Sequence, residues 1–245
     1  MEATTQPLPA GYRQRIGRDG FALVRNVLGS RDIARLIQSL ESVSPGAAVR
    51  QRRNVYGIRN LLEVCPAIRS LAKDRWVRTL IEPILGPRCF AVRGLLFNKT
   101  PDANWNLGWH QDSVIAVRER KSAPGFGAWS LKAGVHQVQP TAEVLSGMLA
   151  LRLHLDDCGP DDGPLRVLPG THDQGWLDDR QESLIRTRRP VVCEARAGDV
   201  LVMRPMLLHA SRPARSPDNR RVVHIEFAAE DLPFGLHWDQ RIGPE

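Results

Sequence analysis

Long apolar runs and cysteine pairs are the first features that this sequence lacks. No hydrophobic stretch approaches the roughly 18 residues that a membrane-spanning helix needs. Residues 1–14 contain no apolar segment of the kind found in secretory signal peptides, so we expect a cytoplasmic protein without a membrane partner. The four cysteines, Cys65, Cys89, Cys158 and Cys193, show no CxxC spacing. This pattern favours free thiols in a reducing compartment over a disulfide-bonded scaffold.

Lysine is also scarce, because nearly all of the 34 basic residues are arginines, and the net charge is +7. Such a balance suits an anionic substrate or a polyanion, but it equally suits an arginine-coated, solvated surface. The basic clusters at 50–53 and 186–189 are short and contain no aromatic residues. We therefore expect no nucleic-acid partner. The sequence carries no signal for an oligomeric state.

The length of 245 residues is that of one large domain, and no segment in the middle has the composition of a linker. We expect residues 1–245 to form a single domain whose first part, 1–86, is mostly helical and packs on the rest. Ser30 is a typical N-cap before apolar residues at helical spacing. Two further short helices are predicted to start at Pro66 and Asp74, the second ending at Gly86.

After residue 86 the pattern changes to short β-type runs separated by Gly, Pro and Asp turns. The runs are Cys89–Lys99, Met148–Leu155, Leu165–Leu168, Pro190–Glu194, Val200–Arg204 and Arg221–Ala228. Short strands after a helical lead-in predict a mainly β fold with flanking helices. We expect residues 87–245 to form a jelly roll with the helices packed outside one of its sheets.

Residues 101–146 show no clear periodicity and contain three tryptophans. Irregular segments of this length within a compact domain are usually functional. We expect an ordered lid over a pocket. Trp129, His136, Gln137 and Gln139 are the candidates for substrate contact.

His209 and Arg220 are the most informative pair. Two β-type runs, one ending at His209 and one starting near Arg221, are joined by a turn rich in Pro, Ser, Asp and Asn. We expect these two residues to lie at the facing ends of paired strands and to line one pocket. There the imidazole could bind iron, and the guanidinium could bind a carboxylate of a small molecule. An upstream His-x-Asp motif would complete the two-histidine, one-carboxylate iron site of oxygenases that keep coordination positions open.

Three His-x-Asp motifs occur, at 110–112, 154–156 and 237–239. The last lies close to the C-terminal end and has no partner histidine after it. The pair at 154 and 156 shares one face of a predicted strand, which suits metal ligands and a hydrogen-bonded outer face equally well. The pair at 110 and 112 lies where the lid segment begins, consistent with the mouth of a barrel. Spacing alone leaves the choice between these two pairs open.

Four segments together resemble a known family. They are Leu95–Asp102 (LLFNKTPD), Trp109–Asp112 (WHQD), Gly163–His172 (GPLRVLPGTH), and His209-Ala210-Ser211 followed by Arg220. In this order and spacing, the chain resembles the phytanoyl-CoA dioxygenase family of iron(II)- and 2-oxoglutarate-dependent oxygenases. The resemblance covers most of the chain. It implies a double-stranded β-helix, which is a jelly roll of the cupin type.

The resemblance also implies a set of site residues. The expected iron(II) ligands, which are also the catalytic residues, are His110, Asp112 and His209. The expected contacts to 2-oxoglutarate are Arg220, Ser211, Leu95, Asn98 and Arg152. Arg220 matches the residue that binds the far carboxylate of the cosubstrate, and Ser211 matches the hydroxyl beside it. Arg152 replaces what is often an aromatic residue.

These residues predict an enzyme that uses O2 to hydroxylate, or otherwise oxidise, an unactivated C–H bond of a small-molecule metabolite. 2-Oxoglutarate would be decarboxylated to succinate. Related enzymes that catalyse halogenation lack this carboxylate, so Asp112 argues against halogenation. Arg50, Arg52 and Arg59 could meet an anionic group of the substrate if they face the mouth. Another cupin-type metal enzyme, which would need the metal ligands but not Arg220, is the alternative. A non-catalytic binding module is a further one.

Overall fold

The computed structural model describes residues 8–243, so the predicted domain of residues 1–245 extends beyond the described part at both ends. None of the helices in the described part is long and apolar enough to cross a membrane. The helices are α1 (Tyr12–Asp19), α2 (Ser30–Glu41), α3 (Leu61–Val64), α4 (Pro66–Leu71), α5 (Arg75–Leu85), α6 (Ala142–Ser146) and α7 (Gln181–Thr187). Two short 3-10 turns, Asp178–Arg180 and Pro233–Gly235, complete the helical elements.

The larger sheet has seven antiparallel strands in the order β1-β12-β9-β14-β4-β3-β2. Their bounds are β1 (Phe21–Val24), β12 (Val200–Met203), β9 (Leu149–His154), β14 (Arg220–Ala228), β4 (Phe90–Lys99), β3 (Val55–Ile58) and β2 (Val49–Gln51). A smaller antiparallel sheet has the order β11-β10-β13-β5. It consists of β11 (Val191–Cys193), β10 (Leu165–Val167), β13 (His209–Ser211) and β5 (Leu107–His110).

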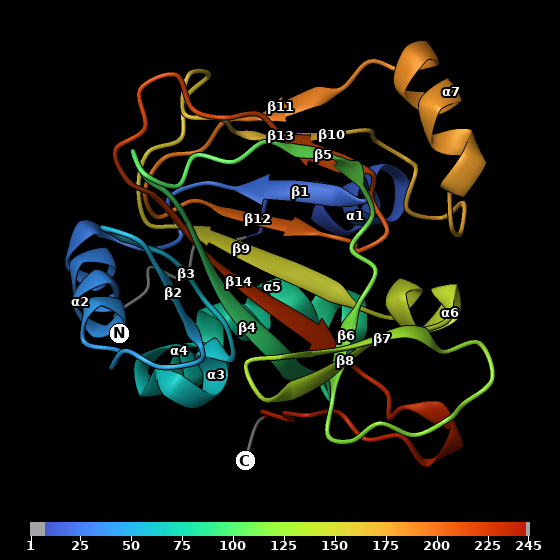
Figure 1. Cartoon of the computed structure of the whole chain (residues 1–245). Coiled ribbons are helices and arrows are strands. Elements are labelled where there is room, and N and C mark those ends of the chain that lie inside the picture. The colour runs from blue at the N-terminus through green and yellow to red at the C-terminus, as the bar shows by residue number, and fades with distance from the viewer. Residues whose placement is uncertain (1–7, 244–245) are drawn as a thin grey trace.

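The two faces of the larger sheet have different partners, because side chains alternate along each strand. Leu151 and Leu153 of β9 and Val223 and Ile225 of β14 pack with α2 to α5 in the main hydrophobic core. A second core fills the space between the two sheets, where Met203 and its neighbours pack against the strands of the smaller sheet. Figure 1 shows this arrangement of two sheets with helices outside the larger one. It is the expected mainly β jelly roll with flanking helices.

The helix boundaries follow from the residues that were used to predict them. The Asp74 side chain caps α5 by accepting a hydrogen bond from the backbone N–H of Trp76 at 3.2 Å, and Gly86 ends the helix. Pro66 occupies the first turn of α4, where its missing N–H costs no hydrogen bond. The N-terminal part is less purely helical than predicted. It also supplies β1, β2 and β3 to the larger sheet.

The segment 101–146 is more regular than predicted. It contains β5, then a separate three-stranded sheet of β6 (Ile115–Val117), β8 (Val135–Gln139) and β7 (Gly127–Lys132), and finally α6. The expectation of an irregular segment was therefore wrong. These strands are short, and β7 is irregular in register and largely exposed, so its sequence carries no clear alternation of apolar and polar residues.

The prediction that His209 and Arg220 lie on paired strands was also wrong. His209 begins β13, which pairs with β10 and β5, whereas Arg220 begins β14, which pairs with β4 and β9. The connection 212–219 therefore crosses from the smaller sheet to the larger one and does not close a hairpin. The two residues still line one cavity, because their strands belong to the two sheets that enclose it.

Candidate active site

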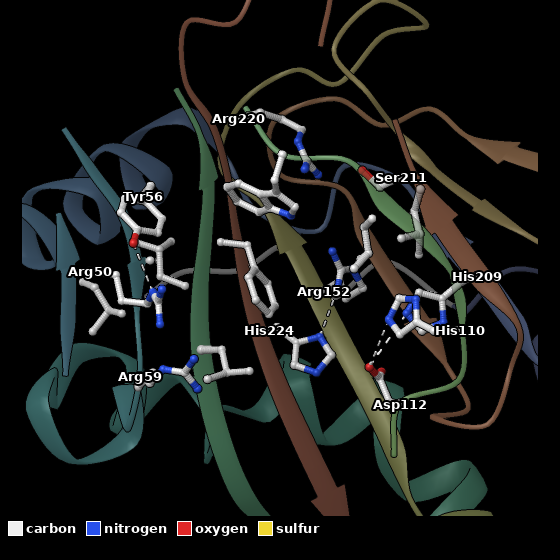
Figure 2. A pocket seen from close by; sticks show the side chains of 18 of the residues that line it. Arg50, Tyr56, Arg59, His110, Asp112, Arg152, His209, Ser211, Arg220 and His224 are labelled. Atoms are coloured by element: carbon white, nitrogen blue, oxygen red, sulfur yellow. Dashed lines mark hydrogen bonds and ion pairs between the residues drawn. The ribbon is translucent and has the colours of Figure 1, made fainter. Parts of the chain in front are cut away.

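Strand register brings two of the predicted metal ligands together. His110 ends β5 and His209 begins β13, and they are direct partners across these strands. Their ring centroids are 4.2 Å apart. Asp112 follows two residues after His110, and its backbone N–H donates to the carbonyl of Pro205 at 2.9 Å. The three side chains meet at one side of the cavity in Figure 2.

The candidate ligand atoms converge on a small volume. Asp112 Oδ1 lies 3.9 Å from His110 Nε2 and 3.8 Å from His209 Nε2. One ligand atom from each residue lies within 4.8 Å of the other two. Within residues 8–243, no other group of three or more His, Cys, Asp or Glu side chains meets this criterion.

The second nitrogen of each imidazole is held by the backbone. His110 Nδ1 lies 2.9 Å from the carbonyl of Gly108, and His209 Nδ1 lies 2.7 Å from that of Leu207. Since a carbonyl only accepts hydrogen bonds, each Nδ1 carries the proton and each Nε2 keeps its lone pair for a metal. Burial lowers the pKa of His209 to about 4, which keeps this imidazole neutral at pH 7.

Asp112 is in the ionised form that a metal ligand requires. Burial raises the pKa of this carboxyl group, but the positive charges of His209, His224 and His110, where these are protonated, and of Arg152 together outweigh burial. The net shift is therefore downward from the ordinary value. Two imidazoles and a carboxylate are a donor set that iron(II) accepts with coordination positions to spare. The residues present therefore fit the metal.

The other two His-x-Asp motifs are not part of this cluster. His154 is buried, and burial lowers its pKa to about 3. Asp156 instead binds Arg221, accepting hydrogen bonds at 2.7 and 2.9 Å from its guanidinium. His237 and Asp239 lie in the C-terminal segment, where the backbone of each bonds to the segment around β6.

A cavity of about 780 Å³ extends from the cluster between the two sheets. Four of the five predicted cosubstrate contacts, Arg220, Ser211, Leu95 and Arg152, line it. Asn98 does not line it and serves a different purpose. Its side-chain oxygen accepts the backbone N–H of Arg220 at 3.0 Å, and its amide nitrogen donates to Val55 and Asn219. Asn98 therefore fixes the start of β14.

Arg220 presents a buried cation to the cavity. It is 5% exposed, and burial lowers its pKa. Its Nε has no hydrogen-bond partner, and none of the described carboxylates forms an ion pair with it. A buried guanidinium without an anion is energetically costly. A ligand carboxylate at this position would offset the cost.

Sequence reasoning missed Lys99, which lies next to Ser211. The Lys99 ammonium donates to Ser211 Oγ at 2.7 Å and to the carbonyl of Arg212. The lysine is fully buried, and burial, followed by repulsion from Arg220, lowers its pKa to about 7. Ser211 in turn donates to the carbonyl of Gly163 at 3.0 Å. Nothing in the run Cys89–Lys99 indicates that its last residue, Lys99, is buried and not exposed at the end of a strand.

Arg152 and three polar residues that sequence reasoning also missed form a chain along the cavity. Arg152 Nη1 lies 3.2 Å from His224 Nδ1, His224 Nε2 lies 3.3 Å from Glu226, and Glu226 pairs with Arg93 at 3.2 Å. Burial lowers the pKa of Arg152 to about 10. Strand alternation could have revealed these residues. Arg220, His224 and Glu226 occupy even positions of β14, between apolar residues from position 222 onward, and therefore share one face.

The residues proposed for substrate contact in the lid do not line the cavity. Trp129, His136, Gln137 and Gln139 belong to β7 and β8 of the separate three-stranded sheet, and none is among the lining residues. Trp129 packs against a hydrophobic cluster beside that sheet. The part of the segment that reaches the cavity is its beginning, from Ala103 to Val114, which includes Trp105.

A cupin-type jelly roll with a candidate metal centre between its sheets is the class that fold and site define. The family model for phytanoyl-CoA dioxygenase (PhyH) matches residues 16–222. The chain therefore belongs to the phytanoyl-CoA dioxygenase family, as its motifs predicted.

Known relatives agree with this membership. The chain is 25% identical over 173 residues to L-proline trans-4-hydroxylase from Streptomyces griseoviridis, a match that covers 67% of this chain and 56% of the relative. The chain thus spans little more than half the length of this relative. Its fold is similar to that of AviO1 from Streptomyces viridochromogenes, with a TM-score of 0.67, 24% identity, and coverage of 94% and 99% of the two chains. It is also similar to EctD from S. alaskensis with 2-oxoglutarate and 5-hydroxyectoine, with a TM-score of 0.70 and 17% identity over 94% and 79%.

Proposed function

We propose that this protein is an iron(II)- and 2-oxoglutarate-dependent dioxygenase that oxidises an unactivated C–H bond of a small-molecule metabolite. The observation that carries the proposal is one cavity with two complementary ends. Two imidazoles and a carboxylate converge within 4.8 Å at the metal end, and the buried cation Arg220 lacks a carboxylate partner elsewhere on the wall. 2-Oxoglutarate has a keto acid that chelates iron and a second carboxylate that suits a guanidinium.

In this proposal, His110, Asp112 and His209 hold the metal through Nε2, a carboxylate oxygen and Nε2, respectively. Three protein ligands leave three of the six positions of iron(II) for cosubstrate and dioxygen. Bound iron supplies the oxidising chemistry, in which C–H, O2 and 2-oxoglutarate become C–OH, succinate and CO2. The protein's part is to orient the reactants and to keep the oxidation on the substrate.

Arg220 anchors the far carboxylate of 2-oxoglutarate, and the Ser211 hydroxyl lies beside it. Lys99 positions Ser211, because its ammonium donates a hydrogen bond to the Ser211 hydroxyl and orients it. Arg152 contributes positive charge between Arg220 and the metal end, where Figure 2 places it. The names of the similar proteins support the proposed class of reaction. One is a proline hydroxylase, and one structure contains 2-oxoglutarate and 5-hydroxyectoine.

The proposal is tested by loading the purified protein with Fe(II) under anaerobic conditions and titrating 2-oxoglutarate by calorimetry. Air is then admitted and succinate is measured. We expect binding that requires the metal, and succinate formation that requires both Fe(II) and O2. His110→Ala should lose both, and His237→Ala, a histidine from the motif outside the cluster, should retain both.

The main alternative is a cupin-type metal enzyme that does not use 2-oxoglutarate. It predicts that Fe(II) binds and depends on the three ligands, while 2-oxoglutarate neither binds nor yields succinate. Iron binding that survives His110→Ala and Asp112→Ala would contradict both candidate functions. The non-catalytic alternative predicts that Fe(II) does not bind to the wild-type protein.

A further inference from the structure

We propose that the wall of the cavity formed by β2, β3 and the residue after β3 binds an anionic oxoacid group of the substrate, a carboxylate or a phosphate, through Arg50 and Arg59. Both arginines line the same cavity as the metal cluster. Figure 2 shows them on the side opposite His110, Asp112 and His209. The inference rests on the proposed function, because it assigns the far side of that cavity to the substrate of the reaction.

Local structure directs Arg50 toward the cavity. Arg50 of β2 is the register partner of Gly57 of β3, which pairs in turn with Phe97 of β4. A Cβ atom at Gly57 would lie 3.3 Å from the carbonyl of Leu96 and 3.8 Å from Arg50 Cβ and Cδ. The tighter of these contacts is with the backbone of β4, so the glycine lets β3 lie close to β4, and the Arg50 stem packs over Gly57 at ordinary van der Waals distance. The guanidinium lies over the ring of Tyr56 at 5.4 Å, and its Nε contacts the Tyr56 hydroxyl at 3.3 Å.

Arg59, directly after β3, is a half-buried cation without a counter-ion. Its guanidinium forms no hydrogen bond or ion pair with any described residue. Burial lowers the pKa of Arg59, and repulsion from Arg50 and Arg93 lowers it further. Lys132 is affected in the same way by burial and by these three arginines. Cations held this close repel one another, and a bound anion would relieve the repulsion.

The charges of the cavity do not balance without an additional anion. Six arginines line it, against two carboxylates, Asp112 and Glu226. Glu226 already pairs with Arg93 at 3.2 Å, and Asp112 is assigned to the metal. Iron(II) and the dianion of 2-oxoglutarate cancel each other's charge. The loaded cavity would therefore remain strongly positive. Arg50, Arg52 and Arg59 are the three cations not assigned to the cosubstrate or to Glu226. Arg52 already donates a hydrogen bond to the carbonyl of Asp102, which leaves Arg50 and Arg59 for an additional anion.

The size of the cavity leaves room for such a substrate. Its volume of about 780 Å³ lies toward the upper end of the range for drug-sized ligands, and 2-oxoglutarate has only five carbons. The wall also offers apolar side chains, including Leu95, Phe97 and Trp105. We infer a substrate with an acidic group at one end and an apolar or weakly polar body that presents a C–H bond to the metal.

The test uses the full protein loaded with Fe(II) under anaerobic conditions, with and without saturating 2-oxoglutarate. Phenylacetate and phenyl phosphate are titrated by calorimetry, with phenylacetamide as the uncharged probe of similar shape. We expect at least one anion to bind about 10- to 100-fold more tightly than the amide, which is the value of a charge-assisted hydrogen bond. The ratio of the two anions tells a carboxylate site from a phosphate site.

The double variant Arg50→Gln/Arg59→Gln should lose this preference while its affinity for 2-oxoglutarate stays within about twofold. Arg13→Gln/Arg31→Gln removes the same charge from exposed helical positions and should change neither affinity. Equal binding of amide and anions, or an undiminished preference in the Arg50/Arg59 variant, would overturn the inference. Failure of the wild-type protein to bind 2-oxoglutarate would instead count against the proposed function. In that case, the probe titrations without 2-oxoglutarate still test whether Arg50 and Arg59 bind an anion.

Discussion

Arg220 and Arg221 are neighbours on β14 that point to opposite faces of the sheet, and we expect their replacement to have opposite effects. Arg220 is a buried guanidinium in the cavity, and no described carboxylate pairs with it. Arg221 binds Asp156 through two guanidinium hydrogen bonds of 2.9 and 2.7 Å, with its side chain 19% exposed. We therefore expect Arg220 to bind a ligand and Arg221 to stabilise the fold.

Arg220→Met should weaken 2-oxoglutarate binding about 10- to 150-fold, because a hydrogen bond to a charged group contributes about 1.5–3 kcal/mol. The same change should leave the ligand-free protein as stable as the wild type or about 0.5–2 kcal/mol more stable, since an unpaired buried cation is removed. Arg221→Met should cost about 1.5–3 kcal/mol of unfolding free energy, because Asp156 loses both guanidinium hydrogen bonds and keeps only the one from the backbone N–H of residue 221. It should not affect 2-oxoglutarate affinity.

Both quantities are measured on the same preparations. Anaerobic calorimetry of the Fe(II)-loaded proteins gives the 2-oxoglutarate affinity, and urea unfolding of the metal-free proteins gives the unfolding free energy. The reasoning is refuted if Arg220→Met binds 2-oxoglutarate like the wild type. It is also refuted if Arg220→Met destabilises the metal-free protein as strongly as Arg221→Met, because the guanidinium would then be a structural group.

Three further results are expected. Loss of a residue that only hydrogen-bonds to a metal ligand lowers metal affinity about 10- to 100-fold. Asp112→Asn should lower Fe(II) affinity by more than this, and unchanged iron content after dialysis would contradict the role of Asp112 as a ligand. Lys99 has a folded pKa of about 7 against 10.5 for the free side chain, so between pH 7 and 10 the unfolded chain binds more protons. The unfolding free energy of the wild type should therefore rise with pH in this range by up to about 1.4 kcal/mol per pH unit relative to that of Lys99→Met. The same pH dependence of the unfolding free energy in both proteins, measured by urea unfolding, would rule this out. Leu153→Ala, in the core, should cost about 2–5 kcal/mol in urea unfolding, whereas Leu131→Ala, 63% exposed, should change stability by less than about 0.5 kcal/mol.

The comparison with Lys99→Met is needed because other groups titrate in the same range. Burial raises the pKa of Cys158 and of Cys193, so their thiols favour the opposite trend, with stability falling as pH rises. The difference between wild type and variant removes these shared contributions. Any remaining slope belongs to the ammonium at position 99 and to groups coupled to it, Arg220 first among them.

Local sequence signals predicted the elements that depend on local physics. The start and end of α5 follow from Asp74 and Gly86, because capping involves only neighbouring residues. The long strands β4 and β14 were recognisable because each is mostly apolar over nine or ten residues. The strands β6 to β8 were not recognised. They are short, and they are stabilised by pairing with one another more than by an alternating pattern.

The sequence by itself determined which residues could form a metal site and a carboxylate anchor, since the chemistry of histidine, aspartate and arginine is independent of the fold. It left two of the three His-x-Asp motifs open, those at 110–112 and 154–156, and the family resemblance, not spacing, selected His110. Only the tertiary structure placed His110 beside His209, because a contact between β5 and β13 is set by strand register across about a hundred residues of chain. The same long-range packing, which no local pattern encodes, put Arg220 on the opposite sheet and turned Asn98 from the cavity. It also placed Arg50 and Arg59 across the cavity from His110, Asp112 and His209.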